Sequence, residues 1–292
     1  MNSEKNHLRL GGQALPEGIL IKGPIFTVIA YREGNDINTV SIKWGFKVLN
    51  NLKKIPFLRG LITILETIGL SLKSIFVMAE VTDDEINTDS IYFKILIGIM
   101  FVLVMAFTIG LVVFLPKLSS KAILNLANLN SVFGTWLELS IRFLLFFVYI
   151  YMYRFFSIGQ NMFQYHAAEH MAIHTYENKH DLTINNIKKF NKEHPRCGTA
   201  FLAFVFIYAN IIFHTLVIDV NFLFLIRLSL SLFVISLTYE TLLLGWKSNN
   251  LIIGKIINLP GYLLQKITTI KPKDSDIELA IVATKKCIEL HD

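Results

Sequence analysis

The feature that most constrains this chain is a series of long apolar runs. Residues 91–115 contain one charged residue, Lys94, close to their start, and residues 200–218 contain none. A helix needs about 20 mostly apolar residues to cross the roughly 30 Å hydrocarbon core of a bilayer. Two further runs, 137–156 and 222–246, are long enough, although each includes charged residues. The sequence therefore predicts four transmembrane helices.

The composition agrees with a membrane protein. Hydrophobic residues make up 53% of the chain and charged residues only 17%, whereas about 25% of the residues in a soluble domain are charged. The net charge of +6 comes from scattered Lys and Arg residues that form no basic stripe, so nucleic acid is not expected as a partner. The expected partner is the lipid bilayer, and the composition leaves room for an oligomer.

The number of lysine and arginine residues alternates between high and low in successive connecting segments. Residues 1–94 hold eleven, 116–136 two, 157–199 five, 219–221 none and 247–292 seven. Segments rich in these residues stay in the cytoplasm, according to the positive-inside rule. We therefore expect a multi-pass protein of the cell membrane with both termini in the cytoplasm. The bundle would cover residues 91–246 and include a histidine-rich cytoplasmic loop at 157–199.

A fifth apolar stretch, residues 56–80, carries three charged residues at seven-residue intervals: Arg59, Glu66 and Lys73. This interval puts them on one side of a helix. Such a helix is more typical of the membrane interface, or of packing on a bundle, than of a span. We expect an interfacial amphipathic helix here; a span would instead reverse the side of the N-terminus.

The two ends, residues 1–55 and 247–292, are expected to be cytoplasmic. In the first of them, alternating apolar residues on both sides of a turn at Gly34–Asp36 predict a small sheet or hairpin lying on the bundle. In the second, Pro260–Gly261 predicts a turn followed by a short helix, and Asp274–Asp276 is typical of a helix start. The expected fold class is a mainly α membrane protein with a small N-terminal β element.

Candidate chemistry concentrates in one segment, where five of the eight histidines fall between positions 166 and 194. His166, Glu169 and His170 form a His-x-x-Glu-His motif. Helical geometry puts these three residues on one face together with His174 and Glu177. Two imidazoles at positions i and i+4 can bind one divalent cation, and a carboxylate beside them can take a proton from water.

We therefore expect His166, His170 and His174 to be ligands of a divalent metal, with zinc the leading choice. Glu169 is the candidate catalytic base, and Glu177 would line the site. The alternative is a polar helix whose histidines contact lipid headgroups or aromatic side chains. A metal bound here could also be structural or sensory, without catalysis.

A second, smaller motif is His194-Pro-Arg-Cys197. His194 is a candidate metal ligand or a partner of one. Histidine and cysteine three residues apart can both ligate zinc, so Cys197 is a candidate for lining the site. A small buried residue before the next apolar run explains Cys197 somewhat better.

Three further polar residues are candidates for the same site. Glu240 stands near the end of the last apolar run, where an ionisable residue is costly and often functional, and it is a candidate metal ligand. Its alternative is a salt bridge to Arg142, Arg154 or Arg227. Gln13 and Glu17 could line the site from the N-terminal segment, although Glu17 also fits an ordinary turn.

Six motifs occur in a fixed order along the chain: GGQALPEGILIKGP (11–24), PFLRG (56–60), YHAAEHMAIHTYE (165–177), HPRCGT (194–199), YE (239–240) and PGYLLQKITTIKPKDSDIELAI (260–281). Together they resemble the YqhQ-like family of bacterial multi-pass membrane proteins. That family carries a domain of unknown function, and its members are regarded as metal-dependent enzymes. The resemblance implies no substrate. It implies site roles for His166, Glu169, His170, His194, Cys197 and Glu240, and more loosely for Gln13 and Glu17.

Two classes of function follow from these expectations. The first is a membrane-embedded metal-dependent hydrolase that acts at the cytoplasmic boundary on a lipid, a lipid-linked intermediate or a membrane peptide. The second is a non-catalytic, metal-stabilised scaffold or assembly factor that docks a membrane-protein partner. Transport is a weaker third class, because four spans could form a path only in an oligomer.

Overall fold

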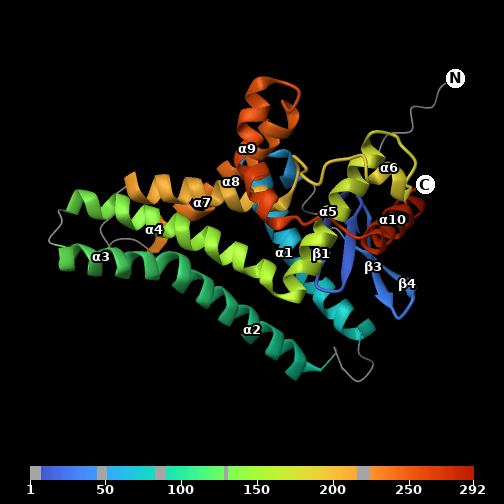
Figure 1. Ribbon diagram of the computed structural model, residues 1–292, viewed down its shortest axis with the longest axis horizontal. Coiled ribbons are helices and arrows are strands. Elements are labelled where there is room, and N and C mark those ends of the chain that lie inside the picture. Colours follow the sequence, from blue (N-terminus) through green and yellow to red (C-terminus); the bar gives the residue numbers. More distant parts are fainter. Residues whose placement is uncertain (1–7, 45–50, 83–89, 128–130, 216–223) are drawn as a thin grey trace. The chain divides into compact units, whose positions relative to one another are not determined.

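The computed structural model describes residues 8–44, 51–82, 90–127, 131–215 and 224–292 (Figure 1). The chain divides into two compact units, Met1–Ile75 with Ser157–Asp292, and Phe76–Phe156. The strands are β1 Gly11–Leu15, β2 Gly18–Lys22, β3 Phe26–Glu33 and β4 Asp36–Lys43. The α-helices are α1 Leu58–Thr82, α2 Ile91–Ile109, α3 Leu115–Ala127, α4 Ser131–Met152, α5 Ser157–Glu177, α6 Ile184–Ile187, α7 Gly198–Thr215, α8 Phe224–Lys247, α9 Ile252–Thr268 and α10 Asp274–Glu289.

The N-terminal strands form one antiparallel sheet in the order β1-β2-β3-β4, which confirms the small β element predicted from the sequence. The tight connection between β3 and β4 uses Gly34 at φ +59°, a conformation that favours glycine. The sheet packs on α10 and α5. Buried residues of β2 and β3 form one core with the apolar sides of these two helices: Ile19, Ile21, Val28, Ala30, Ala168, Met171, Ile277, Ala280 and Ala283.

Of the two C-terminal helices, α10 agrees with the prediction from the sequence and α9 differs from it. α10 begins at Asp274 as expected, because the Asp276 Oδ2 atom accepts the Lys273 backbone N–H at 2.7 Å. The predicted turn at Pro260–Gly261 is wrong, since both residues lie inside α9. A Cβ atom on Gly261 would come within 2.5 Å of the Ala200 side chain. The close packing of α9 on α7 therefore holds a helix where the local signal indicates a turn.

Four described helices are long and apolar enough to cross a membrane: Leu58–Val81, Ile91–Ala127, Trp136–Phe155 and Leu228–Lys247. Their number agrees with the prediction and is consistent with a membrane protein, but the set differs. α7 is apolar over Gly198–Ile212, which is shorter, and residues 216–218 of the predicted span lie outside the described residues. The segment expected to be interfacial, α1, meets the length and composition of a span.

Contacts along α1 tie part of this helix to the N-terminal sheet. The Ser71 hydroxyl donates to the Gln13 Oε1 atom at 2.9 Å. A Cβ atom on Gly69 would lie 3.2 Å from the Trp44 ring. Around Gly69 and Ser71, near its middle, α1 therefore packs against the N-terminal segment.

In the other unit, α2 and α3 run on as one helix through a π-helical turn at Gly110–Phe114 (Figure 1). The sequence predicts a connecting loop at residues 116–136, whereas the chain is helical to Ala127 and again from Ser131. Pro116 lacks the N–H that an α-helix interior needs. The π turn directly before it changes the hydrogen-bond spacing, so the helix can continue past the proline.

Candidate metal centre

α5 is held on one side by the protein core, which fixes the direction of its polar side. Ala168 and Met171 lie in the core shared with the sheet and α10, as the helical spacing predicts for residues that face away from the motif. The opposite side carries His166, Glu169 and His170. Glu169 and His170 are each only 3% exposed, so the motif is an interior feature of the protein.

Two histidines of α5 meet a cysteine from the segment before α7. The His166 Nε2 atom lies 3.1 Å from the Cys197 Sγ atom. The His166 and His170 rings are 4.3 Å apart between centroids. One candidate ligand atom from each of these three residues lies within 4.8 Å of the other two. Among the described residues, these three form the group of His, Cys, Asp or Glu side chains that are close enough to hold one metal ion. We refer to His166, His170 and Cys197 as the His-Cys cluster.

Backbone carbonyls fix the orientation of both histidine rings. The His166 Nδ1 atom is 3.0 Å from the Thr268 carbonyl oxygen, and the His170 Nδ1 atom is 2.6 Å from the Lys192 carbonyl oxygen. A carbonyl can only accept, so each Nδ1 carries the proton and each Nε2 keeps its lone pair. Metal-binding histidines commonly have this arrangement. Burial lowers the pKa of His170 to about 4, which keeps its ring neutral.

Cys197 faces the unprotonated Nε2 atom of His166, so its S–H group donates to that atom at 3.1 Å, and binding of a metal would release this proton. Its Sγ atom is 3.0 Å from the Thr199 hydroxyl and accepts the Thr199 backbone N–H at 3.3 Å. Burial alone would raise the pKa of this thiol. The hydrogen bonds from the Thr199 hydroxyl and backbone N–H oppose burial and lower the pKa. The thiolate is the form of cysteine that binds metals.

Glu169 lies beside the cluster without belonging to it. Its Oε2 atom is 3.6 Å from the His170 Nε2 atom. Burial raises the pKa of Glu169 to about 8; Cys197 adds to the rise, and His166 and Arg196 oppose it. The side chain lies against the backbone of Gly12, where an added Cβ atom would be 2.3 Å from the Glu169 Oε1 atom. The sheet therefore holds the carboxyl group in place through a glycine.

His194 lies next to the cluster, its ring 5.6 Å from that of His170. Its Nδ1 atom accepts the Arg196 backbone N–H at 3.1 Å, so Nε2 carries the proton and faces the Glu177 Oε2 atom at 3.3 Å. Burial lowers the pKa of His194 to about 4. In this arrangement the neutral ring has no free lone pair for a metal. The buried Gln265 amide holds the His194 backbone, accepting its N–H and donating to its carbonyl oxygen.

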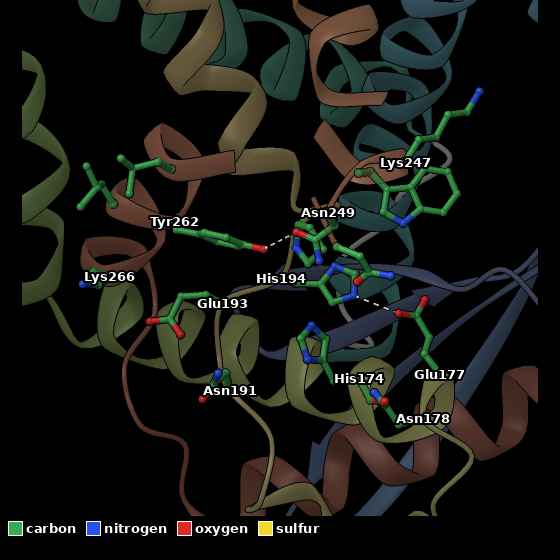
Figure 2. A pocket seen from close by; sticks show the side chains of 15 residues that line it. His174, Glu177, Asn178, Asn191, Glu193, His194, Lys247, Asn249, Tyr262 and Lys266 are labelled. Atoms are coloured by element: carbon green, nitrogen blue, oxygen red, sulfur yellow. Dashed lines mark hydrogen bonds and ion pairs between the residues drawn. The ribbon is translucent and has the colours of Figure 1, made fainter. Parts of the chain in front are cut away.

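A cavity of about 700 Å³ reaches this group of histidines from one side. Figure 2 shows His174 and His194 next to each other on its wall, with Glu177 beyond them. The two rings are 4.4 Å apart. α9 forms another part of the wall through Leu259, Tyr262 and Leu263. The row His174, His194, His170 thus leads from the cavity to the His-Cys cluster.

Three predicted site residues have their contacts elsewhere. Glu240 accepts the Arg59 Nε–H at 2.8 Å and the Phe57 backbone N–H at 2.9 Å, and it forms an ion pair with Arg59. The structure thus places Glu240 in an ion pair between α1 and α8. Gln13 accepts the hydroxyl of Ser71 in α1. Glu17 is exposed in the turn between β1 and β2.

Comparison with known proteins places the chain in a family. The family model described as a protein of unknown function (DUF1385) matches residues 55–290. The chain belongs to the DUF1385 family. A curated relative, the uncharacterized protein YqhQ of Bacillus subtilis (strain 168), is 30% identical over 311 residues, which cover 100% of this chain and 96% of the relative. No solved structure matches the chain significantly.

Several contacts around the site of this DUF1385 chain could not be predicted from its sequence with the patterns used above. The two carbonyls that orient the cluster belong to Lys192 and Thr268, and any residue could supply them. Gln265 does stand inside one of the six motifs, and a buried amide there is a signal that could have been used. Arg59 also stands in a motif, PFLRG, and could have been paired with Glu240 on that ground.

Proposed function

We propose that this protein is a metal-dependent hydrolase at the cytoplasmic boundary of the membrane. His166, His170 and Cys197 would hold the divalent cation, with zinc the preferred ion because imidazole and thiolate are its usual ligands. The observation that carries the proposal is the pair of Nδ1–carbonyl contacts, 3.0 Å and 2.6 Å long. They leave two Nε2 lone pairs beside the Cys197 sulfur. When bound, the cation would supply Lewis acidity and make water a stronger acid.

Glu169 is the proposed general base. Its carboxyl group is buried and 3.6 Å from the His170 Nε2 atom. Burial alone keeps this carboxyl protonated at neutral pH, and the positive charge of a bound cation would favour the ionised form, which can accept a proton from a water molecule next to the cluster. In a hydrolysis the water oxygen bonds to the carbon or phosphorus of the scissile bond. The proton passes to Glu169, and the leaving group departs with the bonding electron pair and takes up that proton. A positioned base of this kind contributes about 10²–10⁴-fold to a rate.

The cavity supports an amphiphilic substrate. Its volume is in the range of about 300–1,000 Å³ that is typical of small-molecule sites. Leu259 and Leu263 of α9 line it and are about half exposed, and the same helix exposes Ile252, Ile253 and Ile256. Such an apolar helix surface fits the membrane interface. A lipid, a lipid-linked intermediate or a membrane peptide could keep its tail at this surface while its polar part enters the cavity.

The orientation that we propose follows from the distribution of Lys and Arg. Both termini would be cytoplasmic, with α1 lying in the membrane interface and not across the membrane, and the His-Cys cluster would be on the same side. This orientation predicts that a cysteine introduced in residues 180–192 is not labelled by a membrane-impermeant reagent added outside the cell. Labelling of that segment from outside would contradict the proposed side of the site.

The test of the hydrolase proposal is the substitution Glu169→Gln. The native host lacking the gene is complemented with wild-type protein, with Glu169→Gln, or with Glu289→Gln as an exposed control carboxylate. Lipid extracts are compared by mass spectrometry, and metal content is measured on each purified protein. We expect Glu169→Gln to keep its metal and to accumulate the same amphiphile as the deletion. The control should match the wild type.

Two outcomes would contradict this proposal. A metal-replete Glu169→Gln protein that restores the wild-type lipid profile would exclude Glu169 as the base. A Glu169→Gln protein that loses its metal would make Glu169 a ligand or a support of one. The second result would favour a non-catalytic, metal-stabilised scaffold, because a closed set of protein ligands is typical of structural sites.

A further inference from the structure

A second cavity, of about 510 Å³, lies between the sheet and the first part of α1. It shares no lining residue with the cavity at His194. Four of its lining side chains are cationic, namely Arg9, Lys22, Lys43 and Lys53, and one, Glu66, is acidic. Four positive charges minus one negative charge leave an excess of three positive charges around one cavity.

Glu66 explains how two of these cations stay in the cavity wall. It is 2% exposed, and its Oε2 atom is 2.5 Å from the Lys53 Nζ atom and 3.8 Å from the Lys22 Nζ atom. Each of these lysine side chains is about two-thirds buried. One carboxylate therefore holds two ammonium groups close together. Each ammonium has three N–H donors, so donors remain for a ligand in the cavity.

Placing the positively charged lysines close together is electrostatically unfavourable. Burial lowers the pKa of Lys22, and the charge of Lys53 lowers it further, while Glu66 opposes both effects. Lys43 is exposed at the same cavity. An anion bound between these groups would offset the repulsion among them. A phosphate group fits, because it accepts several hydrogen bonds from separate ammonium groups.

The surroundings of the cavity are apolar on the side of α1. Ile25 lines the cavity and is 51% exposed. Ile55 and Phe57 follow Lys53 in the chain and are about half exposed, and α1, a candidate membrane span, begins at Leu58. Basic residues directly next to a membrane segment attract anionic lipids. These neighbours favour a lipid over a soluble phosphate ester.

We propose that this cavity binds the phosphate group of an anionic phospholipid, through Lys22, Lys53 and Lys43. The bound lipid would fix the N-terminal sheet against the membrane. The proposal does not depend on the His-Cys cluster or on hydrolysis.

The test is lipid binding by the full-length protein purified in detergent. Native mass spectrometry would follow the titration of dioctanoyl phosphatidylglycerol, dioctanoyl phosphatidylcholine and glycerol 3-phosphate. We expect the anionic lipid to bind at least about 10-fold more tightly than the other two, because it combines the charge with apolar chains. The double variant Lys22→Gln/Lys53→Gln should lose at least about 10-fold in affinity for this lipid. Lys285→Gln, an exposed lysine of α10, is the matched control and should bind like the wild type.

Lys22 and Lys53 are partly buried, so a second variant guards against a folding defect. Lys43 is exposed, so the Lys43→Gln variant should fold normally. Its affinity for the anionic lipid should be about 3-fold lower than that of the wild type. If both variants bound the anionic lipid with the affinity of the wild type, this cavity would not be the binding site. Equal binding of phosphatidylcholine would overturn the role of charge. If glycerol 3-phosphate bound as tightly as phosphatidylglycerol, or more tightly, the proposal of a lipid ligand would be overturned, and the ligand would be a soluble phosphate ester.

Discussion

The Nε2 atom of His166 lies 3.1 Å from the Sγ atom of Cys197, 31 residues later in the chain. This contact joins the middle of α5 to the residue directly before α7. It turns a helical His-x-x-Glu-His motif into a three-residue cluster that combines two nitrogens with one sulfur. The proposed function depends on whether that cluster binds a metal ion.

Replacing the cysteine should remove most of the metal affinity. Cys197→Ala deletes the one sulfur of the cluster, and we expect the affinity for zinc to fall by at least about 100-fold, more than the 10–100-fold typical of losing a residue that only supports a ligand. Competition with a metal-binding dye on purified protein measures this change. Cys287→Ala is the matched control, because Cys287 is also buried but lies on α10 in the core shared with the sheet. Equal affinities in the two variants would count against a sulfur ligand.

Adding one methyl group to the sheet should act on Glu169. In Gly12→Ala the new Cβ atom would lie 2.3 Å from the Glu169 Oε1 atom, so the carboxyl group has to move. We expect the metal to stay bound and the lipid profile to resemble that of the deletion strain. Gly11→Ala is the control, because a Cβ atom there has nothing within 4 Å. If Gly12→Ala restored the wild-type profile, the position of Glu169 would not matter for function.

The ion pair between Arg59 and Glu240 should stabilise the fold without affecting the metal. Glu240→Ala leaves the Arg59 guanidinium and the Phe57 N–H without their acceptor. In a double-mutant cycle with Arg59→Ala, we expect a coupling free energy of about 0.5–3 kcal/mol in thermal or denaturant unfolding. Metal content should equal that of the wild type in all three variants. Loss of metal from Glu240→Ala alone would instead support Glu240 as a ligand.

Gln265 should contribute to stability through the His194 backbone. Its amide is fully buried and makes two hydrogen bonds to that residue, 2.7 Å and 3.1 Å long. Gln265→Ala leaves a buried N–H and a buried carbonyl unpaired, and we expect the free energy of unfolding to fall by about 2–4 kcal/mol. Denaturant unfolding in detergent measures it. Gln160→Ala, at an exposed position of α5, should change stability by less than about 0.5 kcal/mol.

The features that could be predicted from the sequence are those set by local spacing. The His166–Glu169–His170 face follows from the 3.6-residue period, and the antiparallel sheet follows from alternating residues around Gly34. Both are also consistent with the packing around them, since Ala168 enters the core while the polar side faces away from it. Where local pattern and packing agree, sequence reasoning is sufficient.

The remaining features depend on contacts between distant parts of the chain. The partner of Glu240 is Arg59, 181 residues away, and no local period relates them. Pro260 lies in a helix because α9 packs on α7 at Gly261. The carbonyls that orient the two histidines belong to residues whose side chains play no part. Tertiary packing decides each of these, and it overrides the local signal.

The most direct test of the central claim is the metal content of the purified full-length protein, measured by inductively coupled plasma mass spectrometry. The wild type and the His180→Ala control, altered at an exposed histidine outside the cluster, should each carry about one divalent cation per chain, as expected for one cluster of this kind. His166→Ala/His170→Ala should carry less than about a tenth of that amount while remaining folded by circular dichroism. Full occupancy in the double variant would contradict the His-Cys cluster as the metal site, and so would a wild type that binds no metal when zinc is supplied.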